Sequence, residues 1–163
     1  MANTSCSTSL ASSDLHAMGT SIQDVDILWT ADLTVGCPAL DERNMQMLDQ
    51  LSRAASVIAK SDDAQLVAWL FARYDQLDFL LLEEEYELAA AGYPELVFHQ
   101  RLHDRARGVT RHARTQLQRV DTSAALAALA SESCNTMALW LPRHIVDVDR
   151  LFFPYVDSRF RVA

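Results

Sequence analysis

Between residues 63 and 91, the side chains that a core would bury recur at intervals of three and four, the repeat of one helix face. The members of this stripe are Leu70, Tyr74, Leu77, Leu81, Glu84, Leu88 and Ala91. The repeat predicts one long helix that buries a single face. Glu84 stands where an apolar residue is expected, and a buried carboxylate is costly unless it is paired or bound to a metal ion. Glu84 is therefore the first candidate for a functional residue.

The neighbours of Glu84 lead to a different expectation. A run of three glutamates is by itself typical of a solvated surface, so only the stripe position singles out the middle one. We expect Glu83 and Glu85 to face outward.

Three further segments show the helical repeat. They predict helices from Asp41 to about residue 58, from about residue 95 to residue 119, and from residue 123 through Asp149. Gly and Pro number only four each, which favours long helices over many short strands. Residues that start or end helices flank these segments: Asp41, Ser61-Asp62-Asp63, Gly92, and Asp121-Thr122-Ser123.

The connections between the four helices decide the topology. They fall at about residues 59–63, 92–94 and 119–122, and each is too short to cross the length of a bundle. The sequence therefore predicts an all-α fold, an antiparallel up-down-up-down four-helix bundle with an extended N-terminal arm.

The N-terminal segments differ from the helical region. Residues 1–22 are rich in Ser, Thr and Ala without a sustained period, which predicts a mobile tail. Residues 23–40 contain Gly36 and Pro38, which exclude a long helix and favour an extended arm with Trp29 buried against the bundle. We expect residues 23–163 to form one domain.

Charge and cysteine content limit the partners and the compartment. The net charge of −8 disfavours nucleic acid and anionic membranes, which need basic patches. No apolar run is long enough to span a membrane, and no secretory signal begins the chain. Three widely separated cysteines indicate reduced thiols and a cytoplasmic protein. Nothing in the sequence identifies a protein partner.

Polar residues on the inward faces of the predicted helices meet at one end of the predicted bundle. His99 and His103 are one turn apart, as two ligands of one ion must be, although surface pairs of this kind are common. An antiparallel topology brings them to the level of the other inward polar residues. The sequence thus predicts a metal site formed by His99, His103, His144, Glu84, Asp149 and Asn44.

Several short motifs occur in a characteristic order along residues 26–152. They are Trp29 with Leu33-Thr34-Val35-Gly36, Leu40-Asp41-Glu42-Arg43-Asn44, Glu84-Glu85, Gly92-Tyr93-Pro94, His99 with His103, and Trp140-Leu141 with His144-Ile145 and Asp149. In these motifs the chain resembles the hemerythrin family in its bacterial single-domain form. The resemblance implies a non-haem di-iron centre with five histidines and two bridging carboxylates.

The resemblance also assigns roles to individual residues. It gives His99, His103 and His144 to the first iron, and it makes Glu84 and Asp149 the bridging carboxylates. These three imidazoles and two carboxylates suit one divalent ion and leave room for a water molecule.

The second iron of the family takes one histidine from each of the first two helices, and this chain departs from that pattern. The two positions hold Asn44 and Leu80. Asp78-Phe79 looks like the His-Phe pair of the family, but six residues before Glu84 the helix turns it away from that carboxylate. We therefore expect one well-held ion and a second that is weak or absent. Iron ranks first by resemblance, and manganese or zinc also suit the ligands.

Three functions remain open at this stage. The first is a metal-binding protein that binds or senses dioxygen, nitric oxide, peroxide or iron, because reversible oxygen carriage in the family needs two irons. The second is a small metal-dependent redox enzyme, although the nearest thiol, Cys37, lies off the ligand stripe. The third is a metal-free structural or interaction module, since buried histidines and carboxylates can satisfy one another by hydrogen bonds.

Overall fold

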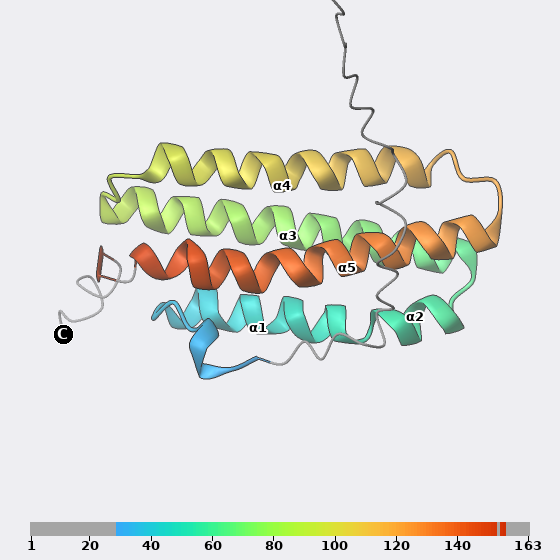
Figure 1. Cartoon of the computed structure of the whole chain (residues 1–163), viewed down its shortest axis with the longest axis horizontal. Coiled ribbons are helices and arrows are strands. Elements are labelled where there is room, and N and C mark those ends of the chain that lie inside the picture. The colour runs from blue at the N-terminus through green and yellow to red at the C-terminus, as the bar shows by residue number, and fades with distance from the viewer. Residues whose placement is uncertain (1–28, 153, 156–163) are drawn as a thin grey trace, which may run out of the picture.

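The structure, a computed structural model, describes residues 29–152 together with 154 and 155. Four long helices lie side by side in antiparallel order, so the predicted up-down-up-down bundle is confirmed (Figure 1). The tail predicted for residues 1–22 lies outside the described residues. The elements are η2 (Ala31–Leu33), α1 (Pro38–Ser52), α2 (Ala54–Lys60), α3 (Asp63–Ala91), α4 (Leu96–Leu117), α5 (Ser123–Asp147) and η3 (Asp149–Phe152).

The predicted boundaries of α3 and the start of α5 are confirmed. The carboxylate of Asp62 accepts a hydrogen bond from the Gln65 N–H at 2.8 Å, and the Gln65 side chain accepts from the Asp62 N–H, which together form a capping box. Gly92 ends α3 with φ of 70°, the left-handed conformation that glycine adopts without strain. Thr122 caps α5 by accepting a hydrogen bond from the Ala125 N–H.

The predicted start and extent of the first helix are wrong. α1 begins at Pro38 rather than Asp41, because the fixed φ of proline suits the first turn and the missing N–H costs nothing there. The helix then stops at Arg53, whose ψ of −3° interrupts the helical backbone, and α2 begins afresh at Ala54. The segment expected as one helix is therefore two.

Asp41 ties the N-terminal arm to α1 instead of capping it. One carboxylate oxygen accepts a hydrogen bond from the Val35 N–H at 2.7 Å, and the other accepts from the Thr34 hydroxyl at 2.6 Å. The arm itself is extended at Thr30 and Thr34, with the single 3-10 turn of η2 between them. Trp29 is half-buried and packs against the core, and Val35 is fully buried.

Replacing Asp41 with Ala is expected to lower the free energy of unfolding by about 1–3 kcal/mol, because the Val35 N–H would lose its partner in a part-buried position. Urea unfolding followed by circular dichroism measures the change. The control is Glu42→Ala, because Glu42 is exposed and accepts a hydrogen bond from Gln46 one turn along the same helix, at 3.2 Å, and the expected change is within about 0.5 kcal/mol. Equal stability of both variants would contradict the anchoring role of Asp41.

The core fills the space between the helices with apolar side chains, among them Leu70, Leu81 and Leu141. Cys134 is part of this core, and burial raises the pKa of its thiol to about 12. None of the helices within the described residues is both long and apolar enough to cross a membrane.

Candidate metal centre

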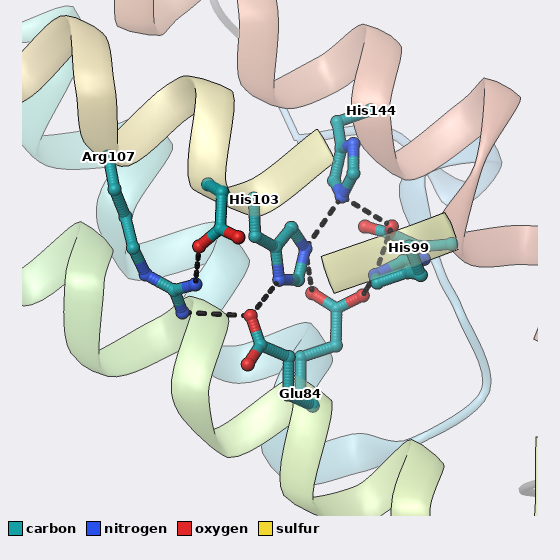
Figure 2. A network of polar contacts seen from close by, with 8 residues as sticks. Glu84, His99, His103, Arg107 and His144 are labelled. Atoms are coloured by element: carbon teal, nitrogen blue, oxygen red, sulfur yellow. Dashed lines mark hydrogen bonds and ion pairs between the residues drawn. The ribbon is translucent and has the colours of Figure 1, made fainter. Parts of the chain in front are cut away.

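Five side chains that can bind a metal ion converge where α3 ends and α4 begins. Each offers one nitrogen or oxygen atom, these atoms all lie within 4.8 Å of one another, and all five side chains are buried. Three helices and the following 3-10 turn contribute them (Figure 2). They are Glu84 from α3, His99 and His103 from α4, His144 from α5, and Asp149 from η3.

The imidazoles face one another and the carboxylates through their Nε2 atoms. His103 Nε2 lies 2.9 Å from His144 Nε2 and 3.9 Å from Glu84 Oε2. His99 Nε2 lies 2.8 Å from Glu84 Oε1. Figure 2 shows Glu84 and the three histidines pointing toward one small volume. Three equivalent nitrogens thus point into the same space.

Asp149 does not continue the helix that carries His144, and this part of the prediction is wrong. α5 ends at Asp147, and Val148, with φ of −123° and ψ of −58°, leaves the helical backbone. In an unbroken helix a residue five positions after His144 would point about 140° away from it around the axis. The end of the helix is what returns the carboxylate to the cluster, with Oδ1 3.0 Å from His144 Nε2.

Burial governs the protonation of the cluster. Loss of solvent, followed by the charge of Asp149, raises the pKa of Glu84 to about 8, although the hydrogen bond from His99 opposes the shift. Burial likewise raises the pKa of Asp149 well above its usual value. Burial first, and then the neighbouring His99, His144 and Arg107, lower the pKa of His103 to about 2, and burial also lowers the pKa of His144. Protonated carboxyls at Glu84 and Asp149 and neutral imidazoles at His103 and His144 are therefore the stable forms when no cation lies among them.

The donor atoms fit one divalent cation. Asp149 Oδ1 lies 3.0 Å from His144 Nε2, yet it forms no hydrogen bond with any residue that the structure describes. That combination of short distance and poor alignment is the geometry of two ligands directed at a common point. Neutral imidazoles and carboxylates are ligands that iron, manganese and zinc accept, and the two carboxylates balance a charge of +2.

The two positions that sequence resemblance relates to a second metal are buried but hold no imidazole. Asn44 on α1 and Leu80 on α3 are each 2% exposed, and Asn44 Oδ1 has no hydrogen-bond partner among the described residues. Phe79 is 54% exposed and lies against the Arg43 guanidinium, so it faces away from the cluster, as predicted. Neither position therefore offers an imidazole to a metal ion.

Glu85 was expected to face solvent, and that prediction is wrong. Its side chain is only 12% exposed, with Oε1 2.7 Å from His103 Nδ1 and 2.8 Å from Arg107 Nη2. One residue along α3 turns the side chain by about 100°, which directs Glu85 toward α4 rather than outward. Glu83, by contrast, has a half-exposed side chain that pairs with Arg43 at 2.8 Å, as expected of an outward-facing residue. One sequence feature could have predicted the direction of Glu85. Arg107 lies one turn after His103, and this cation needs an acidic partner on the facing helix.

Aromatic rings enclose the cluster on two sides. Trp140 stacks on His144 with ring centroids 4.5 Å apart, and Tyr93 and Phe152 meet His99 edge-on at 6.3 and 5.9 Å. On the Trp140 side, a groove of about 620 Å³ runs between α4 and α5 and is partly lined by His144. The rings limit water around the cluster, and the groove brings solvent to one side of it.

Comparison with known proteins identifies the fold. No protein-family model matches the chain, and no curated protein does either. Two crystal structures of hemerythrin match, a tyrosine mutant and an alanine mutant of the same leucine. Each is 22% identical in sequence, with a TM-score of 0.68 over 78% of this chain and 95% of its own. The chain therefore has the hemerythrin fold, with a buried cluster of possible metal ligands at one end of its bundle.

Proposed function

We propose that this protein binds one divalent metal ion in a hemerythrin-like centre. The observation that carries the proposal is the convergence of five buried donor atoms within 4.8 Å. His99, His103 and His144 would supply neutral nitrogen, and Glu84 and Asp149 would supply the compensating charge. Buried carboxylates without a cation would otherwise be a cost that a small domain has no reason to carry.

Iron is the first choice of metal because the solved structures of the same fold are hemerythrins. Manganese and zinc suit the same ligands. A bound iron would supply an open coordination position for a small diatomic molecule or peroxide. The chain contributes the ring of aromatic side chains that limits water and the groove beside His144 that gives access.

A second ion would be held weakly or not at all. At its expected position the chain offers only the Asn44 carbonyl oxygen and the outer oxygens of the shared carboxylates, and Leu80 donates nothing. A centre with one well-held ion favours binding or sensing of dioxygen, nitric oxide, peroxide or iron over bulk oxygen carriage. Buried free thiols at Cys37 and Cys134 support a reducing compartment such as the cytoplasm.

Metal analysis of the purified protein tests this function. We expect one ion per chain after loading with ferrous iron, and we expect His103→Ala to abolish metal binding, because it removes a ligand from the centre of the cluster. The matched control is His112→Ala, an exposed histidine on the same helix, which should still hold one ion. Two ions per chain would contradict the weak second site. Absence of metal together with an unchanged melting temperature in the presence of a chelator would contradict the proposal as a whole.

A metal-free structural or interaction module is the second candidate. The hydrogen bonds of His99 with Glu84, at 2.8 Å, and of His103 with His144, at 2.9 Å, favour it because they partly satisfy the cluster without a cation. The same metal analysis separates the two functions.

A further inference from the structure

We propose that Glu85 is a positioning residue for the metal centre: it fixes the tautomer of His103, so that the Nε2 lone pair of this histidine is directed at the metal. The inference rests on the proposed function, because it names the residue that prepares one of the ligands. Glu85 itself lies outside the five-ligand cluster and would not touch the metal.

The contact between Glu85 and His103 crosses the interface between α3 and α4. Glu85 Oε1 lies 2.7 Å from His103 Nδ1, the ring nitrogen that faces away from the cluster. His103 is completely buried and Glu85 nearly so, which keeps water from competing for this hydrogen bond. His103 thus lies between the cluster on its Nε2 side and this carboxylate on its Nδ1 side.

The chemistry of the pair decides where the proton of His103 lies. A neutral imidazole carries one N–H, and a carboxylate can only accept a hydrogen bond. The short contact therefore requires the proton on Nδ1 of His103, which leaves Nε2 with its lone pair free. His144 must then donate from its own Nε2 across the 2.9 Å contact when no ion is bound, and a metal ion would take the place of that proton.

Other charged residues hold Glu85 in position. Arg107 lies one turn after His103 on α4, and its Nη2 atom is 2.8 Å from Glu85 Oε1, at ion-pair distance although not in hydrogen-bond alignment. Asp104 lies 3.4 Å from the Nη1 atom of the same guanidinium. The carboxylate oxygen that contacts His103 thus also has a cation at ion-pair distance, which restricts the rotamers of Glu85.

His99 provides the comparison within the same site. Its Nδ1 atom is buried and has no hydrogen-bond partner among the described residues. Its Nε2 atom lies 2.8 Å from Glu84 Oε1, and because either group can be the donor in this contact, it does not fix the tautomer of His99. Of these two histidines on α4, only His103 has a partner on Nδ1 that directs its Nε2 lone pair toward the metal position before a metal binds. Carboxylate partners of metal-binding histidines raise ligand basicity and affect metal affinity by about 10–100-fold.

Two substitutions and one control test the proposal. In Glu85→Ala we expect zinc affinity, measured by competition with a chelating dye, to fall by about 10–100-fold. Glu85→Gln keeps an acceptor for the Nδ1–H but removes the charge, so its affinity should lie between those of the wild type and the alanine variant. Glu83→Gln removes a charge from the adjacent, outward-facing residue and should bind zinc as the wild type does.

Nitrogen-15 NMR of the histidine rings in the metal-free protein reports the tautomer of His103, which would not change if Glu85 only supported the fold. The wild type should show His103 protonated on Nδ1. Glu85→Ala, and Glu85→Gln with an amide that can donate as well as accept, should show a mixture of the two tautomers. Protonation of His103 on Nε2 in the wild type, or zinc affinity of Glu85→Ala within about twofold of the wild type, would overturn the proposal. A wild type that binds no metal but shows the Nδ1 tautomer would refute the proposed function and leave the role of Glu85 in setting the tautomer standing.

Discussion

Replacing Asn44 and Leu80 together with histidine is expected to raise the iron content from one ion to two per chain. Leu80 lies four residues before Glu84 on α3, one turn away on the same buried face, and Asn44 faces the core from α1. Two imidazoles at these positions would join the outer oxygens of the shared carboxylates. Three hard oxygen atoms alone hold a transition metal weakly, whereas two added nitrogens make the site competitive.

The two single variants are the controls for this experiment. Asn44→His and Leu80→His each add only one imidazole, so we expect each to bind close to one ion when metal per chain is measured by mass spectrometry. A buried histidine without a metal is destabilising, so the double variant should melt below the wild type until iron is added. If the double variant still holds one ion, the two positions are not those of a lost second site.

Removing the metal is expected to destabilise the protein, and to do so more at pH 8 than at pH 5. Burial raises the pKa of Glu84 from its usual 4.5 to about 8 in the folded, metal-free protein. A carboxyl group whose pKa is raised by folding stabilises the fold only in its protonated form, so this stability is full below pH 4.5 and is lost as the pH rises toward 8. A bound cation keeps the carboxylate ionised without that loss. The lowered pKa of His103 makes the same contribution to the stability of the metal-bound and the metal-free protein, because this imidazole is neutral in both.

The magnitude follows from binding linkage. A metal concentration of about 1,000 times Kd stabilises the folded state by roughly 4 kcal/mol, which corresponds to a rise in Tm of roughly 8–16 °C for a domain of this size. Thermal unfolding with and without a chelator, at both pH values, measures the effect. His103→Ala, which lacks a central ligand, should show no metal-dependent rise in Tm at either pH. A rise in the wild type that is equal at pH 5 and pH 8 would contradict the assigned protonation of Glu84.

The sequence predicts most of the fold because each long helix carries its own evidence. The stripe from Leu70 to Leu88 sets the buried face of α3, and Asp62 and Gly92 set its ends through local hydrogen bonds and backbone conformation. The first helix was harder to delimit. A proline in the first turn and a break at Arg53 both depend on how the arm and α2 pack, which the helical repeat does not contain.

The site shows the same division between local and long-range information. Four of the five ligands, Glu84, His99, His103 and His144, could be assembled from periodicity and topology, because inward residues at one level of an antiparallel bundle must meet. The path of Asp149 could not, since the exit of the chain from α5 at Val148 has no sequence signal comparable to Gly92. The inward direction of Glu85 could not be predicted either, because it depends on the rotation of α3 against α4.

The order of the five donors along the chain determines which parts of the molecule a bound ion would cross-link. All five lie between Glu84 and Asp149, so an ion held there would close loops through α3, α4 and α5 and would leave α1, α2 and the arm outside them. The entropy of closing a loop rises with the logarithm of its length, so the long segment from His103 to His144 would account for the largest share of this constraint. Partly unfolded states that keep the ion bound would thus be restricted in the second half of the chain alone. Opening of the first half would remain governed by its own packing and by the hydrogen bonds of Asp41.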